Sequence, residues 1–231
     1  MNKQELRDLV EKYYTGDKHL WPDWMSYESG NTEVRYDYDS SKLCYSLIRH
    51  FKPTSVFECG ASFGHSTIFI TDALLKNGLP FKFISFELEP EIYRAARANL
   101  IKRHGKLIPK LILGNVIKNN HKLPKEIDFA FIDTNHDAES TKWYIENVFP
   151  RLKDGALVAI HDFAVEILPD GTWNGKGPNG SGGLAETQIL IGLHEQGILP
   201  LEPLYFNFHN PLFEGDNINW EASFWIYRKL K

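Results

Sequence analysis

The stretch VFECGASFGHST, from Val56 to Thr67, decides the fold of this 231-residue chain. Its apolar run ends in an acid, Glu58, and then Gly60 and Gly64 precede the apolar segment TIFITDALL. This order predicts a buried strand, a tight glycine turn and the start of a helix. Glycine lets the backbone approach a ligand closely, and the first turn of a helix offers free N–H groups to polar atoms. The stretch alone is weak evidence for a ligand site, and it gains weight from the motifs that follow.

The composition favours one globular, cytoplasmic protein that binds neither nucleic acid nor membranes. A net charge of -4 and a pI of about 6.1 provide no basic surface for nucleic acid or anionic lipid. No apolar run reaches the roughly 20 residues that span a bilayer, and the charged, amphipathic N-terminal segment is unlike a signal peptide. Two cysteines, Cys44 and Cys59, make no disulfide framework, so we expect a reducing, cytoplasmic setting.

Strand and helix patterns alternate along most of the chain. The expected helices cover residues 2–15, 39–51, 66–76, 90–104, 138–149 and 184–195. The expected strands cover residues 55–58, 81–87, 110–113, 127–132, 156–161, 204–209 and 223–228. Apolar strands between amphipathic helices indicate a parallel sheet with helices on both faces, and the last two strands are close enough in sequence to pair antiparallel. We therefore expect an α/β fold with a Rossmann-like, seven-stranded sheet that is mostly parallel and has an antiparallel last strand.

Two parts are expected within the chain: an N-terminal helical and aromatic arm, residues 1–45, packed on a main domain, residues 46–231. The aromatic segment 19–38 fits no helical or strand period, and it is either a packing flap or a wall of a substrate pocket. The glycine-rich segment 168–183 is either a disordered excursion or a lid that contacts the substrate through Trp173. The arm could also cross to a neighbouring subunit and form a homodimer.

Polar residues follow the central strands at the edge where open α/β sheets bind ligands. The first expected strand ends in Glu58 and leads into the glycine turn. The second ends in Glu87, where an acid can accept hydrogen bonds from both hydroxyls of a ribose. The alternative role for Glu87 is to cap the helix that begins at Pro90. Because Glu89 can fill that role, the ribose interpretation is favoured.

The next three strands bring further polar groups to the same edge: Asn115 and Val116, then Asp133 with His136, then His161 with Asp162. Each has an ordinary alternative. Asp133 could cap a helix, His161 could be a satisfied buried histidine, and the others could be surface loop residues. Their expected meeting at neighbouring strand ends favours a functional site.

Five motifs in order, among them FIDTNHDAE at 131–139 and AIHDF at 159–163, make residues 40–231 resemble a class I S-adenosylmethionine-dependent methyltransferase. More narrowly, the chain resembles the small metal-dependent O-methyltransferases of the catechol and caffeoyl-CoA types and the bacterial sugar and antibiotic-tailoring members. The resemblance implies transfer of a methyl group from S-adenosylmethionine to a hydroxyl of a small molecule, such as a sugar, a phenol or a natural product.

The resemblance also implies roles for individual residues. By position, the cofactor-binding residues would be Glu58, Gly60, Ser62 and Ser66 at the methionine part, Glu87 at the ribose, Asn115 and Val116 at the adenine, and Asp133. A divalent metal, Mg²⁺, Mn²⁺ or another, would be held by Asp133, His161 and Asp162. His136 stands where the catechol-type enzymes have a catalytic lysine, so His136 would act as the base and Asp133 would share in catalysis.

The chain departs from the pattern of these enzymes at two positions. Ser62 replaces the middle glycine of the turn, which is common among the bacterial sugar and antibiotic-tailoring members. His161 replaces a carboxylate of the catechol type, and the resulting Asp/His/Asp set is more typical of a transition metal than of magnesium. The predicted metal therefore has less support than the predicted cofactor.

Three other functions are alternatives to methyl transfer. A catalytically silent nucleotide- or S-adenosylmethionine-binding module would bind the cofactor without turnover, but the set Asp133, His136 and Asp162 is intact. An NAD-dependent oxidoreductase would need a nicotinamide half-site, and the second half of the chain has no such pattern. A third alternative is that the chain is a metal-dependent, hydroxylase-like member of the same group.

Overall fold

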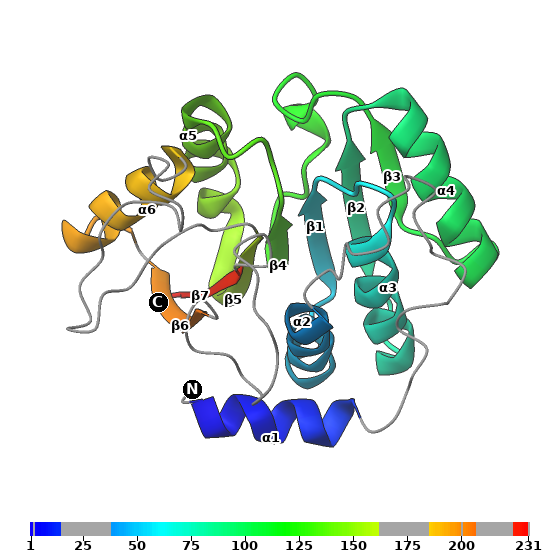
Figure 1. Cartoon of the computed structure of the whole chain (residues 1–231), viewed down its shortest axis with the longest axis horizontal. Helices are drawn as coiled ribbons and strands as arrows, with labels where there is room; N and C mark the ends of the chain where they lie inside the picture. The colour runs from blue at the N-terminus through cyan, green and yellow to red at the C-terminus, as the bar shows by residue number, and fades with distance from the viewer. Residues whose placement is uncertain (2, 15–37, 162–184, 200, 207–223, 231) are drawn as a thin grey trace.

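A seven-stranded sheet forms the centre of the computed structural model, which describes residues 1, 3–14, 38–161, 185–199, 201–206 and 224–230 (Figure 1). The strands are β1 (Ser55–Cys59), β2 (Lys82–Glu87), β3 (Lys110–Leu113), β4 (Ile127–Ile132), β5 (Leu152–His161), β6 (Leu201–Phe206) and β7 (Phe224–Lys229). The helices are α1 (Lys3–Tyr13), α2 (Tyr38–Phe51), α3 (His65–Asn77), α4 (Pro90–His104), α5 (Ala138–Asn147) and α6 (Ala185–Glu195). Two short 3₁₀ turns are η1 (Asn120–Lys122) and η2 (Phe149–Arg151).

The strand order is β3-β2-β1-β4-β5-β7-β6. The first five strands of this order are parallel to one another, whereas β7 pairs antiparallel with both β5 and β6. The order reverses between β1 and β4, which is the switch point where such sheets bind ligands at the carboxyl ends of the strands. The predicted fold class, with its antiparallel final pair, is confirmed.

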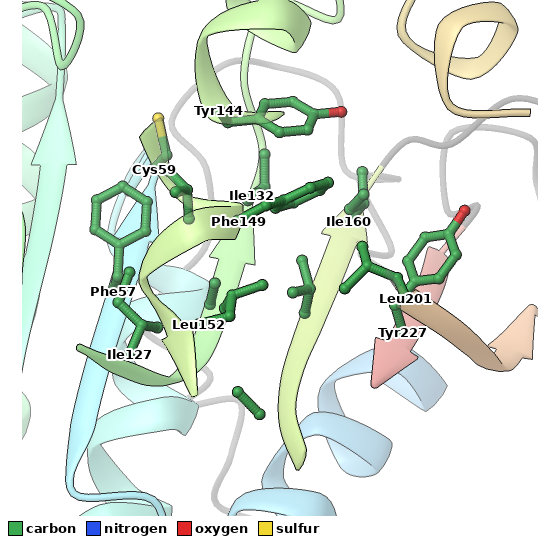
Figure 2. Close-up of a cluster of buried hydrophobic side chains, with 14 of the residues drawn as sticks. Phe57, Cys59, Ile127, Ile132, Tyr144, Phe149, Leu152, Ile160, Leu201 and Tyr227 are labelled. Atoms are coloured by element: carbon green, nitrogen blue, oxygen red, sulfur yellow. The ribbon is translucent and has the colours of Figure 1, made fainter. Parts of the chain in front are cut away.

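Alternating side chains of the strands supply a separate apolar core on each face of the sheet. On one face, α1, α2 and α3 pack against side chains that include Val56, Phe129 and Leu157. On the other face, α5 and α6 pack against a second core (Figure 2). Its fully buried members include Phe57 and Ile132. Residues on both sides of the expected boundary at position 45 contribute to the first core.

The elements begin and end within a few residues of the expected positions, with one larger difference around Pro150. The helix expected to reach Phe149 ends at Asn147, and β5 begins at Leu152 rather than at residue 156. Proline disfavours helical backbone in the residue before it and removes a hydrogen-bond donor, so the 3₁₀ turn η2 fills this gap. Within the described part of the chain, no helix is long and apolar enough to cross a membrane.

Several predicted features lie outside the described residues. These are the aromatic segment up to residue 37, the glycine-rich segment 168–183 with Trp173, and the predicted metal ligand Asp162.

The turn after β1 depends on a close approach between two backbone segments. Gly60 has φ +93°, and a Cβ atom built there would lie 1.8 Å from the carbonyl oxygen of Asp133. The Asp133 N–H donates to the Cys59 carbonyl at 2.8 Å, and the Gly60 N–H donates to Phe86 at 3.1 Å. Only glycine fits between these neighbours, which explains why the turn needs this residue.

Glu58, near the end of β1, stabilises the structure around the same turn through side-chain hydrogen bonds. It is fully buried, and its carboxylate accepts hydrogen bonds from the hydroxyls of Ser66 (2.6 Å), Thr67 (2.6 Å) and Ser85 (2.5 Å). Burial raises the pKa of Glu58 to about 7, although the three hydroxyl donors act in the opposite direction. Glu58 thus links β1 to β2 and to the first turn of α3.

We expect the substitution G60A to destabilise the protein by about 2 kcal/mol more than G78A. Both glycines have positive φ, but a Cβ at Gly78 meets nothing within 4 Å, so G78A tests the backbone strain alone. Urea unfolding of both variants measures the difference, and equal losses would contradict the close approach to Asp133.

The raised pKa of Glu58 predicts a loss of stability with rising pH. The ordinary pKa of a glutamate is about 4.5, and in the folded protein that of Glu58 is about 7. Between these two pH values the folded protein keeps a proton on Glu58 that the unfolded chain releases. The free energy of unfolding of the wild type should therefore fall relative to that of E58Q, by about 3 kcal/mol between pH 4 and pH 8. Urea unfolding at both pH values checks this, with E91Q on the exposed surface as the control. Parallel pH profiles of wild type and E58Q would refute it.

Candidate active site at the carboxyl edge of the sheet

A cavity of about 400 Å³ opens at the carboxyl ends of β1, β2, β3 and β4. Its size lies within the range of small-molecule sites. Of the residues predicted to bind the cofactor, six line it: Gly60, Ser62, Glu87, Asn115, Val116 and Asp133. The apolar residues on its wall include Phe86, Leu88, Ile92 and Ile117.

Glu87 is one of the acids that line this cavity. Its Oε2 accepts the Ser62 N–H at 2.8 Å, and its Oε1 accepts the Glu89 N–H at 2.9 Å. Ser62 has φ +46°, so the carboxylate also stabilises a left-handed backbone in the glycine turn. Each oxygen of a carboxylate has a second lone pair, and Glu87 can therefore accept further hydrogen bonds from a ligand.

The expectation that Glu89 caps α4 is wrong. Glu89 occupies the N-cap position, but its side chain makes no capping hydrogen bond. The Glu87 carboxylate instead binds the backbone N–H of Glu89, so Glu87 both supports this helix start and lines the cavity. The capping role and the cavity-lining role of Glu87 are therefore compatible.

Asn115 and Val116 border the cavity from the turn after β3. Asn115 Oδ1 accepts the backbone N–H of Ile117 at 2.8 Å, which fixes the turn. Gly114, with φ +123°, donates its N–H to the Glu87 carbonyl at 2.8 Å. The turn is thereby tied to the end of β2, and the side chain of Asn115 serves the loop itself.

Two predicted cofactor residues, Glu58 and Ser66, do not line the cavity. The hydrogen bond between them and the complete burial of Glu58 direct both polar groups into the protein. The structure therefore supports a structural role for this pair, which keeps the glycine turn and α3 in place. The sequence motif alone could not distinguish this role from direct contact with a ligand.

Asp133 brings the cavity into contact with two histidines. His136 Nε2 lies 3.6 Å from Asp133 Oδ1, and His161 Nδ1 lies 3.7 Å from Asp133 Oδ2. Neither histidine lines the cavity, whereas Asp133, which lies beside both, does. His161 is buried and packs near the ring of Phe131. The predicted gathering of Asp133, His136 and His161 is present in the structure.

Glu186 and Tyr144 complete this cluster, and the sequence analysis missed both. His136 Nδ1 lies 2.6 Å from Glu186 Oε2, and the Tyr144 hydroxyl donates to Glu186 Oε1 at 2.8 Å. A signal for Glu186 was available, because it precedes Leu190 and Leu193 at i, i+4, i+7 on the apolar face of its helix. A charged residue on such a face is unusual and indicates a buried partner.

The surroundings of His136 favour its protonated form, which cannot act as a base. Burial disfavours its charged form, but the hydrogen bonds and charges of Asp133 and Glu186 outweigh burial and raise the pKa of His136 to about 10. In this geometry His136 is an imidazolium at neutral pH and has no free lone pair to take a proton.

The described residues alone do not form the predicted metal site. No group of three or more His, Cys, Asp or Glu side chains among them has the arrangement of a metal site. Both oxygens of Asp133 face imidazole nitrogens, and the charge of His136 already offsets that of Asp133. The metal stays a prediction that depends on Asp162, outside the described residues.

Comparison with known proteins agrees with this architecture. Residues 57–163 match the family model of a methyltransferase domain. A search of curated proteins finds no match. The matched segment runs from β1 past the end of β5 and thus includes every strand end that borders the cavity.

Solved structures share the fold at low sequence identity. An S-adenosylhomocysteine-bound methyltransferase of Podospora anserina is 16% identical with a TM-score of 0.61, covering 98% of this chain and 88% of its own. An O-methyltransferase of Streptomyces achromogenes, involved in tomaymycin synthesis and solved with S-adenosylmethionine, is 15% identical (TM-score 0.57; 99% and 89% covered). An O-methyltransferase of Bacillus cereus, solved with S-adenosylhomocysteine, is 12% identical (TM-score 0.59; 100% and 92% covered).

The glycine turn, the acid at the end of β2 and the strand order agree with the family match over the central part of the chain. Residues 57–163 thus match a methyltransferase domain, and the chain shares the fold of solved methyltransferases.

Proposed function

We propose that this protein transfers the methyl group of S-adenosylmethionine to a hydroxyl of a small molecule, such as a sugar, a phenol or a natural product. The observation that carries the proposal is one cavity that is lined both by the residues predicted to bind S-adenosylmethionine and by the predicted catalytic residue Asp133. Structural relatives that are O-methyltransferases with bound S-adenosylmethionine or S-adenosylhomocysteine support the choice of donor and reaction.

The donor fits the cavity in a defined way. Glu87 would accept the ribose hydroxyls with the lone pairs that the backbone N–H groups leave available. Ile92 and Val116 would contact the adenine ring, and the turn with Gly60 and Ser62 would lie beside the methionine part. The sulfonium carries a positive charge, which suits a cavity whose wall includes carboxylates.

The acceptor hydroxyl would approach Asp133. Its oxygen attacks the methyl carbon as the carbon–sulfur bond breaks, and the bonding electrons pass to sulfur, which becomes a neutral thioether. The hydroxyl proton passes to the Asp133 carboxylate, which acts as the base. His136, held as a cation beside Asp133, would stabilise negative charge that develops on the oxygen. Alignment of the three reacting atoms in the cavity supplies much of the rate enhancement.

This role for His136 replaces the base expected from the sequence, while both residues named as catalytic keep a part in the reaction. None of these steps passes through a metal. The alternative of a silent binding module differs in its outcome, because it would bind S-adenosylmethionine and transfer no methyl group to any acceptor.

We expect E87Q to weaken S-adenosylmethionine binding by about 10- to 100-fold, because hydrogen bonds to a charged group are lost. Calorimetric titration of wild type and variant, each with EDTA and with Mg²⁺, measures the change. E91Q, an exposed acid of α4, is the matched control and should bind like the wild type. An unchanged affinity in E87Q would reject the ribose role, and a wild type that does not bind under either condition would reject the donor.

We expect H136N to reduce turnover by about 100-fold or more while the affinity for S-adenosylmethionine changes by less than about threefold. Asparagine tolerates the left-handed backbone of this position, where φ is +56°, so the loop should keep its conformation. Methyl transfer to a panel of catechols and hydroxylated sugars, followed by mass spectrometry, gives the rate. Full turnover in H136N would show that the imidazolium has no part in the reaction.

A further inference from the structure

We infer that Glu186 is a positioning residue of the proposed methyl-transfer site, which holds the His136 ring so that Nε2 faces Asp133. Its catalytic meaning rests on the proposed function, whereas the contact between the two side chains can be tested without any turnover.

The burial of Glu186 calls for a specific role. Glu186 is fully buried in the first turn of α6, beside the buried Thr187 and on the face that carries Leu190. A buried carboxylate is costly unless charged or hydrogen-bonding partners compensate it, and helix packing here needs only apolar side chains. Its partners therefore indicate what the residue does.

The two oxygens of Glu186 have different partners. Oε1 accepts the hydroxyl of Tyr144 at 2.8 Å, and Oε2 lies 2.6 Å from His136 Nδ1. Tyr144 is fully buried on α5, and its hydroxyl projects from the apolar cluster (Figure 2). With Oε1 fixed by this rigid side chain, the carboxylate presents Oε2 to one nitrogen of the imidazole, and the other nitrogen, Nε2, faces Asp133.

A backbone hydrogen bond also joins Glu186 to His136. The Glu186 N–H donates to the His136 carbonyl at 3.3 Å, and His136 has the left-handed φ of +56°. A non-glycine residue in this conformation is strained unless its surroundings hold it. Residue 186 thus fixes both the backbone and the ring of residue 136, from 50 positions away in the sequence.

The experiment compares two variants with two matched controls. E186Q removes the charge, and Y144F removes the hydroxyl that orients the carboxylate. E139Q makes the same charge change at an exposed acid in the first turn of α5. Y45F removes the hydroxyl of a buried tyrosine in the apolar core on the opposite face of the sheet. Because Y144F retains the charge, it tests the contact even if E186Q does not fold.

Two readouts are needed. In ¹⁵N-histidine NMR spectra, E186Q and Y144F should shift the Nδ1 signal of His136, assigned with H136N, while E139Q and Y45F leave it unchanged. In kinetics, E186Q should lower kcat by about 10- to 100-fold and Y144F by about three- to tenfold, with S-adenosylmethionine affinity within about twofold of the wild type.

Each outcome is decisive. An unshifted Nδ1 signal in both variants would overturn the contact, and a shifted signal with unchanged kcat would make Glu186 a structural tie for α6 and overturn the positioning role. If the wild type bound S-adenosylmethionine but methylated no acceptor, the proposed function would fail, while a shift caused by E186Q would still support the contact.

Discussion

The site depends on the absence of one side chain at Gly60. The carbonyl oxygen of Asp133 lies 1.8 Å from the place of a Cβ at residue 60, and the Asp133 N–H donates to the carbonyl of Cys59, the residue before Gly60. The ends of β1 and β4 therefore meet more closely than side chains would allow. This contact sets the distance between the glycine turn, where the donor is proposed to bind, and the carboxylate proposed to meet the acceptor.

Three buried glutamates at this edge of the sheet show how one residue type serves different purposes. Glu58 accepts hydrogen bonds from three hydroxyl groups and links two strands to a helix. Glu87 accepts hydrogen bonds from two backbone N–H groups. Glu186 contacts the imidazole of His136 and accepts a hydrogen bond from the phenol of Tyr144. Only Glu87 also lines the cavity. Burial and charge alone therefore do not identify a ligand-binding acid, because the partners of the carboxylate and its access to the cavity decide its role.

Much of the fold followed from local patterns, because apolar strand runs and glycine turns are encoded within a few residues. The strand ends, and thus the meeting of Asp133 with His136 and His161, followed from the rule that parallel strands end at one edge. The contact of His136 with Glu186 could not be foreseen, since it joins segments 50 positions apart. The orientation of Glu58 was equally inaccessible, because one motif fits an acid that faces the ligand and an acid that faces the protein.

The same long-range contact changes the charge of the site. Asp133 and Glu186 contribute two negative charges and the His136 imidazolium one positive charge, so the cluster carries a net charge of about −1. A bound sulfonium would neutralise it. In the proposed reaction the sulfur would lose its charge as the methyl group leaves, and the proton released by the hydroxyl would neutralise Asp133. The proposed cluster and donor would therefore have no net charge before or after transfer, whereas a neutral histidine base and the donor would together carry one positive charge throughout.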